Sequence, residues 1–341
     1  MEILNKTPFK VFAAPAVCQH DDNHMVVVIK GTYDLPTQTG GRIKIAKEQL
    51  DILFADEYWG EPEDSSVRYE SDLAIVKHGA DVILNGSAYA PNGRATEMFV
   101  KLSVAGQNKT IKVFGDRHWK KTTGGLEITR PLPFDKMPLQ YENAFGGADK
   151  VQEDPDKPQM EERNPVGKGF ASRKAAELLN GLPLPNLESP DQLISKWKDK
   201  PDPAGFGVVP RHWAPRKNLA GTYDEAWLAE RSPLLPADFD EAYYSAASPG
   251  MLLKKELLPG APVTVINASE EGPLEFQLPT FGIFVENSVA KKTDLGQAIL
   301  DTVVIEPDEN RLLLTWRLSF KCHWNLSKIE WLKVTGRSGR G

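Results

Sequence analysis

Apolar and polar residues alternate along much of residues 1–130, as expected for β-strands. The Arg-Ile-Lys-Ile stretch at residues 42–45 alternates with a period of two, which is typical of a half-buried strand. The continuous apolar run at residues 25–29 predicts a strand that is buried on both faces. Residues 98–104 and 109–114 flank an Ala-Gly-Gln-Asn turn, which predicts a hairpin. Short strands at this spacing indicate an N-terminal antiparallel β lobe.

The same pattern returns in residues 256–335. Residues 274–278 alternate regularly between apolar and polar side chains. Residues 300–305 and 312–317 are strand-like and flank a Pro-Asp-Glu-Asn turn, so we predict a second hairpin there. We therefore expect a C-terminal β lobe, followed by a frayed Gly- and Arg-rich tail at residues 336–341.

Residues 131–255 lack this strand pattern. Half of the chain's 26 prolines fall between residues 151 and 250, and proline cannot donate a hydrogen bond to a β ladder. Aromatic residues are nevertheless frequent here, whereas disordered linkers are poor in them. We predict an ordered, irregular segment with short helices at residues 171–179 and 223–231. The predicted fold is thus mainly β, with two antiparallel, sandwich-like lobes bridged by a Pro- and aromatic-rich segment.

Charge and composition narrow the possible partners. The formal net charge is -6 over 341 residues. Nucleic acids and anionic membranes attract basic surfaces, so we expect neither as a partner. No apolar run in the sequence approaches the ~20 residues of a membrane-spanning helix, and the short apolar stretch at residues 9–18 is interpreted as a strand rather than a secretion signal. The two cysteines, Cys18 and Cys322, predict a reduced, cytoplasmic protein without a disulfide between them.

Residues 20–24 (His-Asp-Asp-Asn-His) are the densest group of metal-type ligands in the sequence. We interpret them as a polar hairpin loop, because no cysteine or third histidine is expected nearby to complete a metal site. The sequence therefore predicts neither a metal nor another cofactor.

Several carboxylates lie between Asp56 and Glu70, beside aromatic residues. A glycosidase needs two carboxylates about 5–10 Å apart next to a sugar-binding platform, so a carbohydrate-active hydrolase is one interpretation. The alternative is that these acids pair with cations such as Arg68 or Lys77, or form a solvated loop.

The stretch from Arg68 to Asp72 alternates long polar side chains. On a strand, Arg68, Glu70 and Asp72 would share one face, with Tyr69 and Ser71 opposite. This face would carry an ion-pair ladder, or it would bind a partner, because Arg and Tyr are enriched at interface anchors.

Sequence signatures of catalysis are missing. The sequence contains no Gly-x-Ser-x-Gly, no phosphate-binding Gly-x-x-x-x-Gly-Lys-Ser/Thr and no His-Glu-x-x-His. We therefore expect a protein that is not an enzyme.

An ordered series of unusual segments runs through the chain. The segments are DEYWGEPEDSSVRYESDLA (56–74), LNGSAYAP (84–91), FGDR (114–117), MPLQYENAFGG (137–147), RNPVGKGF (163–170), LPNLE (184–188), PAGFGVVPRHWAPR (203–216), LAGTYDEAW (219–227), LLPADFD (234–240) and LDTVVIEPDENRLLLTWR (300–317). Together they resemble a bacterial family first catalogued as a domain of unknown function. Its members are found beside PAAR-repeat spike-tip proteins, spike proteins and toxins.

The resemblance implies a role in type VI secretion, where some members are described as effector-loading adaptors. Such an adaptor would hold a toxic effector with its PAAR-type tip and promote its loading onto the spike, with the spike protein as a second partner. The resemblance supplies no catalytic residues. The alternatives remain the hydrolase and a structural subunit of the secreted particle.

Aromatic and arginine side chains are the expected partner-binding residues, because such residues dominate interface energetics. They lie in the stretch around residue 68 and in the Pro-rich belt at residues 197–244. The candidates are Arg68, Tyr69, Trp197, Arg211, Trp213, Arg216, Tyr223 and Trp227. The alternative is that most of the belt's aromatic side chains are buried against the two lobes.

Overall fold

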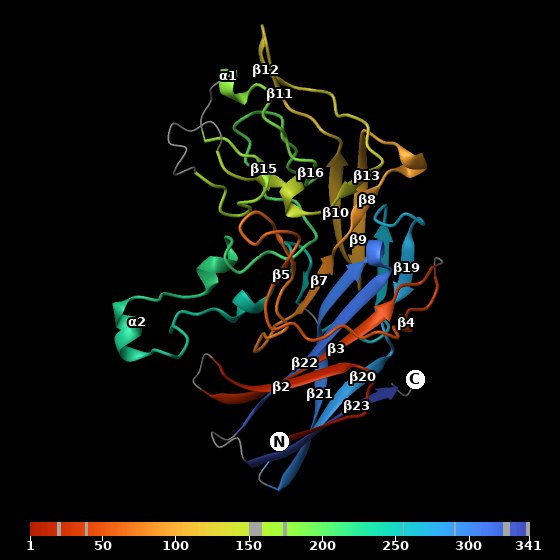
Figure 1. Ribbon diagram of the computed structural model, residues 1–341, viewed down its shortest axis with the longest axis vertical. Coiled ribbons are helices and arrows are strands. Elements are labelled where there is room, and N and C mark those ends of the chain that lie inside the picture. Colours follow the sequence, from red (N-terminus) through yellow and green to blue (C-terminus); the bar gives the residue numbers. More distant parts are fainter. Residues whose placement is uncertain are drawn as a thin grey trace.

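The chain folds mainly into β-sheets (Figure 1). Strands make up 43% of the described residues and helices 9%, which confirms the prediction of a mainly β fold with few, short helices. The computed structural model describes residues 1–18, 22–37, 40–149, 159–172, 176–254, 256–289, 291–322 and 328–338.

The larger sheet has ten strands. Its main path runs β1 (Glu2–Asn5), β23 (Ile329–Ser338), β20 (Phe281–Val289), β21 (Lys292–Glu306), β22 (Arg311–Lys321), β3 (Asn23–Asp34) and β2 (Lys10–Val17). Three short strands extend it, namely β4 (Lys44–Ile45) beside β3, β7 (Ala80–Leu84) beside β21 and β17 (Leu252–Leu253) beside β7. Most neighbours are antiparallel, but β1 pairs with β23, and β7 with β21, in parallel.

The second sheet has five strands, and it also joins distant parts of the chain. Its order is β16 (Leu187–Glu188), β10 (Gln107–Phe114), β9 (Glu97–Val104), β18 (Pro262–Ile266) and β19 (Leu274–Gln277). The β9–β10 pair is the hairpin that the sequence predicts at residues 98–104 and 109–114, and β21–β22 is the second predicted hairpin. Local hydrophobic patterns were therefore sufficient to find both hairpins.

Short elements fill the remainder of the described chain. The two-stranded pairs are β11 (Trp119–Thr122) with β12 (Gly125–Ile128), β13 (Lys136–Pro138) with β8 (Ser87–Tyr89), β14 (Phe145–Gly146) with β15 (Lys168–Gly169), and β5 (Glu57–Tyr58) with β6 (Val67–Tyr69). The helices are α1 (Ala176–Leu179), α2 (Glu225–Glu230) and the 3-10 turns η1 (Pro91–Gly93), η2 (Tyr141–Asn143), η3 (Arg216–Leu219), η4 (Glu241–Tyr244) and η5 (Pro307–Glu309).

One continuous apolar core joins the two large sheets. It contains Ile29 of β3, Leu314 of β22, Leu102 of β9 and Val265 of β18, all of them fully buried. Because both sheets contribute to this core, each depends on the other for the burial of its apolar face.

The strand pairing differs from a division into an N-terminal lobe at 1–130 and a C-terminal lobe at 256–335. Strands β3 and β7 pair with β22 and β21 in the larger sheet, and β9 pairs with β18 in the smaller one. Each sheet therefore combines strands from both ends of the chain. In its described residues, the irregular segment at 131–255 contributes only short strands and helices, and it lies beside the large sheets (Figure 1).

Two local predictions need adjustment. Helix α1 covers the end of the helix predicted at residues 171–179, of which residues 173–175 lie outside the described residues, and α2 lies within the helix predicted at 223–231. The tail predicted to fray from residue 336 is instead paired up to Ser338, because β23 continues along β20. The last three residues lie outside the described part.

Among the described residues, no helix has the length and apolar character that a bilayer crossing requires.

Candidate docking surface

The stretch from Arg68 to Asp72 lies inside a network of ion pairs. Arg68 contacts Glu306 and Glu309 at 3.4 and 3.1 Å, and its guanidinium lies 4.6 Å from the ring centre of Trp59. The Tyr69 hydroxyl donates to Glu306 over 2.5 Å. Burial, and then this hydrogen bond to a carboxylate, raise the pKa of Tyr69, so the phenol keeps its proton.

The two acids of this stretch are also paired with remote cations. The Glu70 carboxylate forms ion pairs with Arg211 Nε at 2.7 Å and with an Arg216 guanidinium nitrogen at 2.9 Å. Asp72 pairs with Lys30 at 2.8 Å. The charges therefore alternate as predicted, but they pair with residues of other elements and do not form an ion-pair ladder with one another. Each charge instead ties β6 and the residues after it to another element.

This packing bears on the hydrolase interpretation. Asp56 accepts the backbone N–H of Ser71, and Glu70 is held between two arginines. The cavity lined by Tyr69, Glu70 and Asp72 has a volume of about 30 Å³, far below the roughly 300–1,000 Å³ that is typical of ligand pockets. It does not admit a sugar ring.

A projecting arm, residues 216–245, begins directly beside this network. Arg216 forms its base, where it donates to the Val209 carbonyl at 2.5 Å and to the Tyr243 carbonyl at 2.5 and 3.1 Å. The Arg216 side chain is only 5% exposed. Five donors in a planar fork suit arginine to such a site, because it can satisfy two carbonyls and the Glu70 carboxylate together.

The two chain segments of the arm are held together near its base. η3 and η4 lie against each other, and Asp240 N–H donates to the Leu219 carbonyl at 3.0 Å. Below them, Val209 N–H donates to the Ala246 carbonyl at 2.9 Å. Phe239 is buried at the base and packs on Tyr243. The chain thus enters and leaves the arm at adjacent points.

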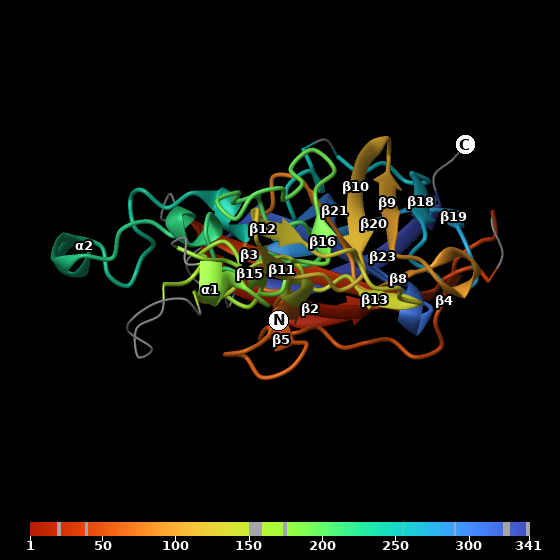
Figure 2. The same cartoon turned by 90° about the horizontal axis from the view of Figure 1, so that it is seen from above.

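The tip of the arm is α2, which lies away from the body in two perpendicular views (Figures 1 and 2). Asp224 caps its N-terminus by accepting the Trp227 N–H at 2.8 Å. The Trp227 indole N–H donates to the Leu234 carbonyl, and its ring contacts Tyr223 edge to face. These local bonds fold the tip although none of the residues in α2, all of them described, is buried.

The surface of the tip is apolar and acidic. Tyr223 is 55% exposed and Leu228 is 64% exposed. Residues 220–245 contain six carboxylates and one basic residue, Arg231, whose Nε is bound to the Leu235 carbonyl. The arm therefore presents a small apolar patch, with negative charge around it, to the surroundings.

The predicted partner-binding residues fall into three groups. Tyr69, Trp213 and Arg216 are buried, so they stabilise the fold and are not surface anchors. Trp213 is only 1% exposed and packs edge to face on Tyr141. This corrects the prediction for these three residues, because the sequence pattern does not distinguish a buried aromatic or arginine from an exposed one.

The other predicted anchors are more accessible. Arg68 and Arg211 are partly exposed but already form ion pairs, and Trp197 packs on a small core beneath α1. Tyr223 and Trp227 lie together at the arm tip. The structure adds Leu228, which the sequence analysis missed. Its signal was a leucine directly after Trp227 in a predicted helix whose neighbouring residues are Ala and Glu.

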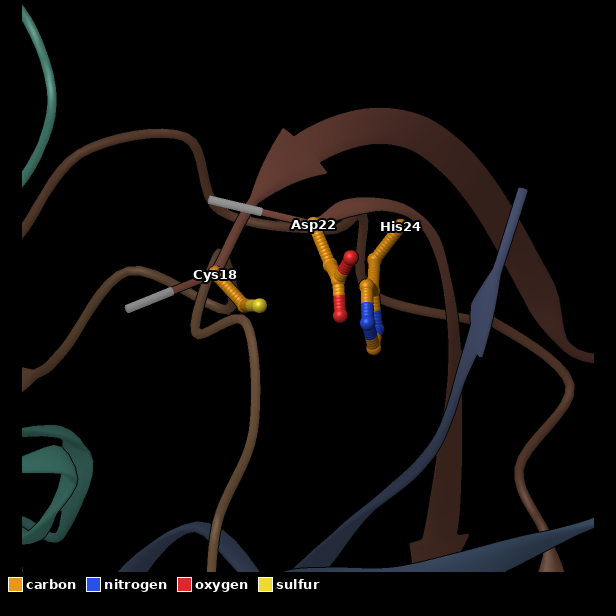
Figure 3. A group of neighbouring side chains, drawn as sticks. All are labelled: Cys18, Asp22 and His24. Atoms are coloured by element: carbon orange, nitrogen blue, oxygen red, sulfur yellow. The ribbon is translucent and has the colours of Figure 1, made fainter. Parts of the chain in front are cut away.

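Metal-type ligands also converge at one place in the described structure. Cys18, Asp22 and His24 bring a thiol, a carboxylate and an imidazole to within 4.8 Å of one another (Figure 3). The prediction that no cysteine lies near residues 20–24 is therefore wrong, because the Cys18 N–H donates to the Asp22 carbonyl and holds the two residues together. His20 and Asp21 lie outside the described residues. Cys18 and Cys322 are both free thiols.

The fold and this surface define a mainly β protein with an acidic, apolar-tipped projecting arm. A family model described as an uncharacterized protein conserved in bacteria (DUF2169) matches residues 20–317, and the chain belongs to this family. The chain matches no curated protein and no solved structure.

Proposed function

We propose that this protein is an adaptor of a bacterial type VI secretion system. It binds a toxic effector that carries a PAAR-type tip and promotes the loading of this effector onto the secretion spike. The proposal combines the resemblance of the motifs in residues 56–317 to effector-loading adaptors with the geometry of the arm.

The observation that carries the proposal is the tip of the arm. An isolated helix as short as α2 is unstable in water, and most helices in proteins gain stability by burying an apolar face. Here the capping residue Asp224 and the Trp227–Leu234 hydrogen bond hold the helix, and its apolar side chains remain exposed. A preorganised apolar surface of this kind reduces the entropy that is lost when a partner binds.

The composition of the arm indicates the character of the partner surface. Leu228 and Tyr223 suit an apolar depression, and the surrounding carboxylates suit a basic rim. Complementary charges accelerate encounter, and the buried apolar contact supplies most of the affinity. We therefore propose that the effector binds the arm tip through an apolar pocket bordered by Lys or Arg.

The proposal places the protein in the cytoplasm, where its free cysteines stay reduced before the effector is loaded. It assigns no catalytic role to the chain, because the acids between Asp56 and Glu70 are explained by ion pairs, backbone hydrogen bonds or exposure to solvent. A structural subunit would instead be released with the spike.

The test is capture of partners by the tagged full-length chain in its native bacterium, with identification by mass spectrometry. Leu228→Ala and Tyr223→Ala remove the tip contacts. Leu132→Ala is the matched control, because Leu132 is similarly exposed at 61% but lies outside the arm. If the tip residues are hot spots, each variant loses about 2 kcal/mol of binding, or roughly 30-fold in affinity.

The expected result is capture of a protein with a PAAR-type tip by the wild type and by Leu132→Ala, with a large loss for both tip variants. Equal capture by all four proteins would contradict the role of the arm. Accumulation of the chain in culture supernatant with the spike would favour the structural subunit. Turnover of a carbohydrate polymer by the purified chain would favour the hydrolase.

A further inference from the structure

The turn end of the β2–β3 hairpin gathers three different ligand groups. Cys18 follows β2, Asp22 precedes β3, and His24 is the second residue of β3. The Cys18 N–H donates to the Asp22 carbonyl at 3.1 Å, which closes the hairpin and places the two side chains opposite each other. Figure 3 shows the three side chains extending into the same space beside the hairpin. All three residues are half-buried.

The chemistry of this donor set favours zinc. Thiolate, imidazole and carboxylate are the three zinc ligands that proteins use, whereas calcium and magnesium prefer oxygen alone. Bonds of about 2.0–2.3 Å to a tetrahedral zinc would place the ligand atoms about 3.3–3.6 Å apart. The ligand atoms lie within 4.8 Å of one another, so movements of about 1 Å would bring them into this range.

Two residues of the neighbouring strand β22 support the ligands from behind. His24 Nδ1 lies 2.9 Å from the Ser319 hydroxyl. When Nδ1–H donates to this oxygen, the lone pair of Nε2 is available for a metal, which is how metal-binding histidines are usually oriented. Lys321 lies 2.7 Å from one Asp22 oxygen and orients the carboxylate.

We propose that Cys18, Asp22 and His24 form a zinc site with three protein ligands and a fourth position open to water or to a ligand from outside the chain. Binding converts the Cys18 thiol to a thiolate, and its proton is released to solvent. The thiolate and the carboxylate balance the charge of Zn²⁺. Because Ser319 and Lys321 lie on β22, the bound metal fastens the hairpin end to that strand. This site is independent of the arm.

The test uses the reduced full-length chain after removal of metals with a chelator. Titration with Co²⁺, a spectroscopic substitute for zinc, should produce a thiolate-to-cobalt charge-transfer band that Zn²⁺ then abolishes at one equivalent. Cys18→Ser should lose the band, and Cys322→Ser should keep it. The second cysteine is a matched control, because it is also a free thiol but lies outside the cluster.

A second pair of variants covers the case in which Cys18→Ser fails to fold. Asp22→Asn should keep the thiolate band but weaken zinc binding. Ser319→Ala, which removes only the support of His24, should lower zinc affinity about 10-fold. Absence of the band in the wild type, its persistence in Cys18→Ser, or its equal loss in Cys322→Ser would overturn the proposal. Unchanged zinc affinity in both Asp22→Asn and Ser319→Ala would do the same.

Discussion

Replacement of Glu70 by glutamine tests how strongly the base of the arm is held. The change preserves size and removes the negative charge that faces Arg211 and Arg216. Burial opposes the charge on Arg211, but Glu70, together with Asp56 and Tyr243, outweighs this effect and raises the pKa of Arg211. The variant would leave the Arg216 guanidinium buried without a carboxylate.

The size of the effect follows from this geometry. Loss of one partner from a buried ion pair costs about 3–5 kcal/mol. The Glu70 side chain is only 8% exposed, but Arg216 retains two carbonyl acceptors in the variant. We therefore expect the free energy of unfolding to fall by about 3 kcal/mol, the lower end of this range. Unfolding entropy of about 2.1 cal/mol/K per residue gives about 0.7 kcal/mol per degree for this chain, so the Tm should fall by roughly 4 °C.

The assay is thermal unfolding of the purified full-length chain, with Glu309→Gln as the control. Glu309 also pairs with an arginine, at 3.1 Å, but its side chain is half exposed. An exposed pair contributes about 0–1 kcal/mol, so the control should shift the Tm by about 1 °C or less. Equal shifts for the two variants, or a smaller shift for Glu70→Gln, would refute the argument from burial.

Three further predictions concern other parts of the chain. Burial lowers the pKa of Lys109 to about 7. Between about pH 7 and 10 the unfolded chain still holds this proton and the folded chain does not, so the free energy of unfolding should increase as the pH rises. Lys109→Met should flatten this part of the Tm–pH curve, and an unchanged slope would contradict the assignment. Gly221 has a φ of 80°, and an added Cβ would lie 2.8 Å from Pro236, so Gly221→Ala should increase proteolysis within the arm. Gly250→Ala is the control: Gly250 has a similar φ but open surroundings, so this change should increase proteolysis much less. A fragment of residues 1–150 lacks the partner strands β18–β22 and should be insoluble or unfolded by circular dichroism, while a soluble fragment that melts cooperatively would disprove this dependence.

The sequence was most informative where structure is local. The hairpins β9–β10 and β21–β22 connect strands that are adjacent in sequence, so alternation and turn residues were enough to predict them. The parallel pairing of β1 with β23 joins the two ends of the chain. No local pattern encodes it, because alternation specifies which face of a strand is buried but not which strand lies beside it.

The same limit explains the outcome for the candidate residues. Trp213 and Trp227 lie in one Pro-rich belt, yet the first is in the core and the second is on the arm. Whether each side chain is buried depends on whether a sheet packs against it, and this is a tertiary property that the local sequence does not specify. Cys18 was missed as a neighbour of His24 for a related reason. The sequence of residues 20–24 contains no cysteine, and the third ligand comes from the end of the preceding strand, which the hairpin brings beside Asp22.

The closed base of the arm has an evolutionary consequence. Because Leu219 and Asp240 are joined by a backbone hydrogen bond, the intervening loop behaves as an insertion between two fixed points. Insertions at such exposed, closely spaced ends are well tolerated. Within this loop, residues 228–233 lie between two of the segments that resemble the family, so they can change in length and sequence while the two sheets keep their register. If the arm binds the partner as proposed, exchange of residues 228–233 between members of the family should alter partner choice without redesign of the core.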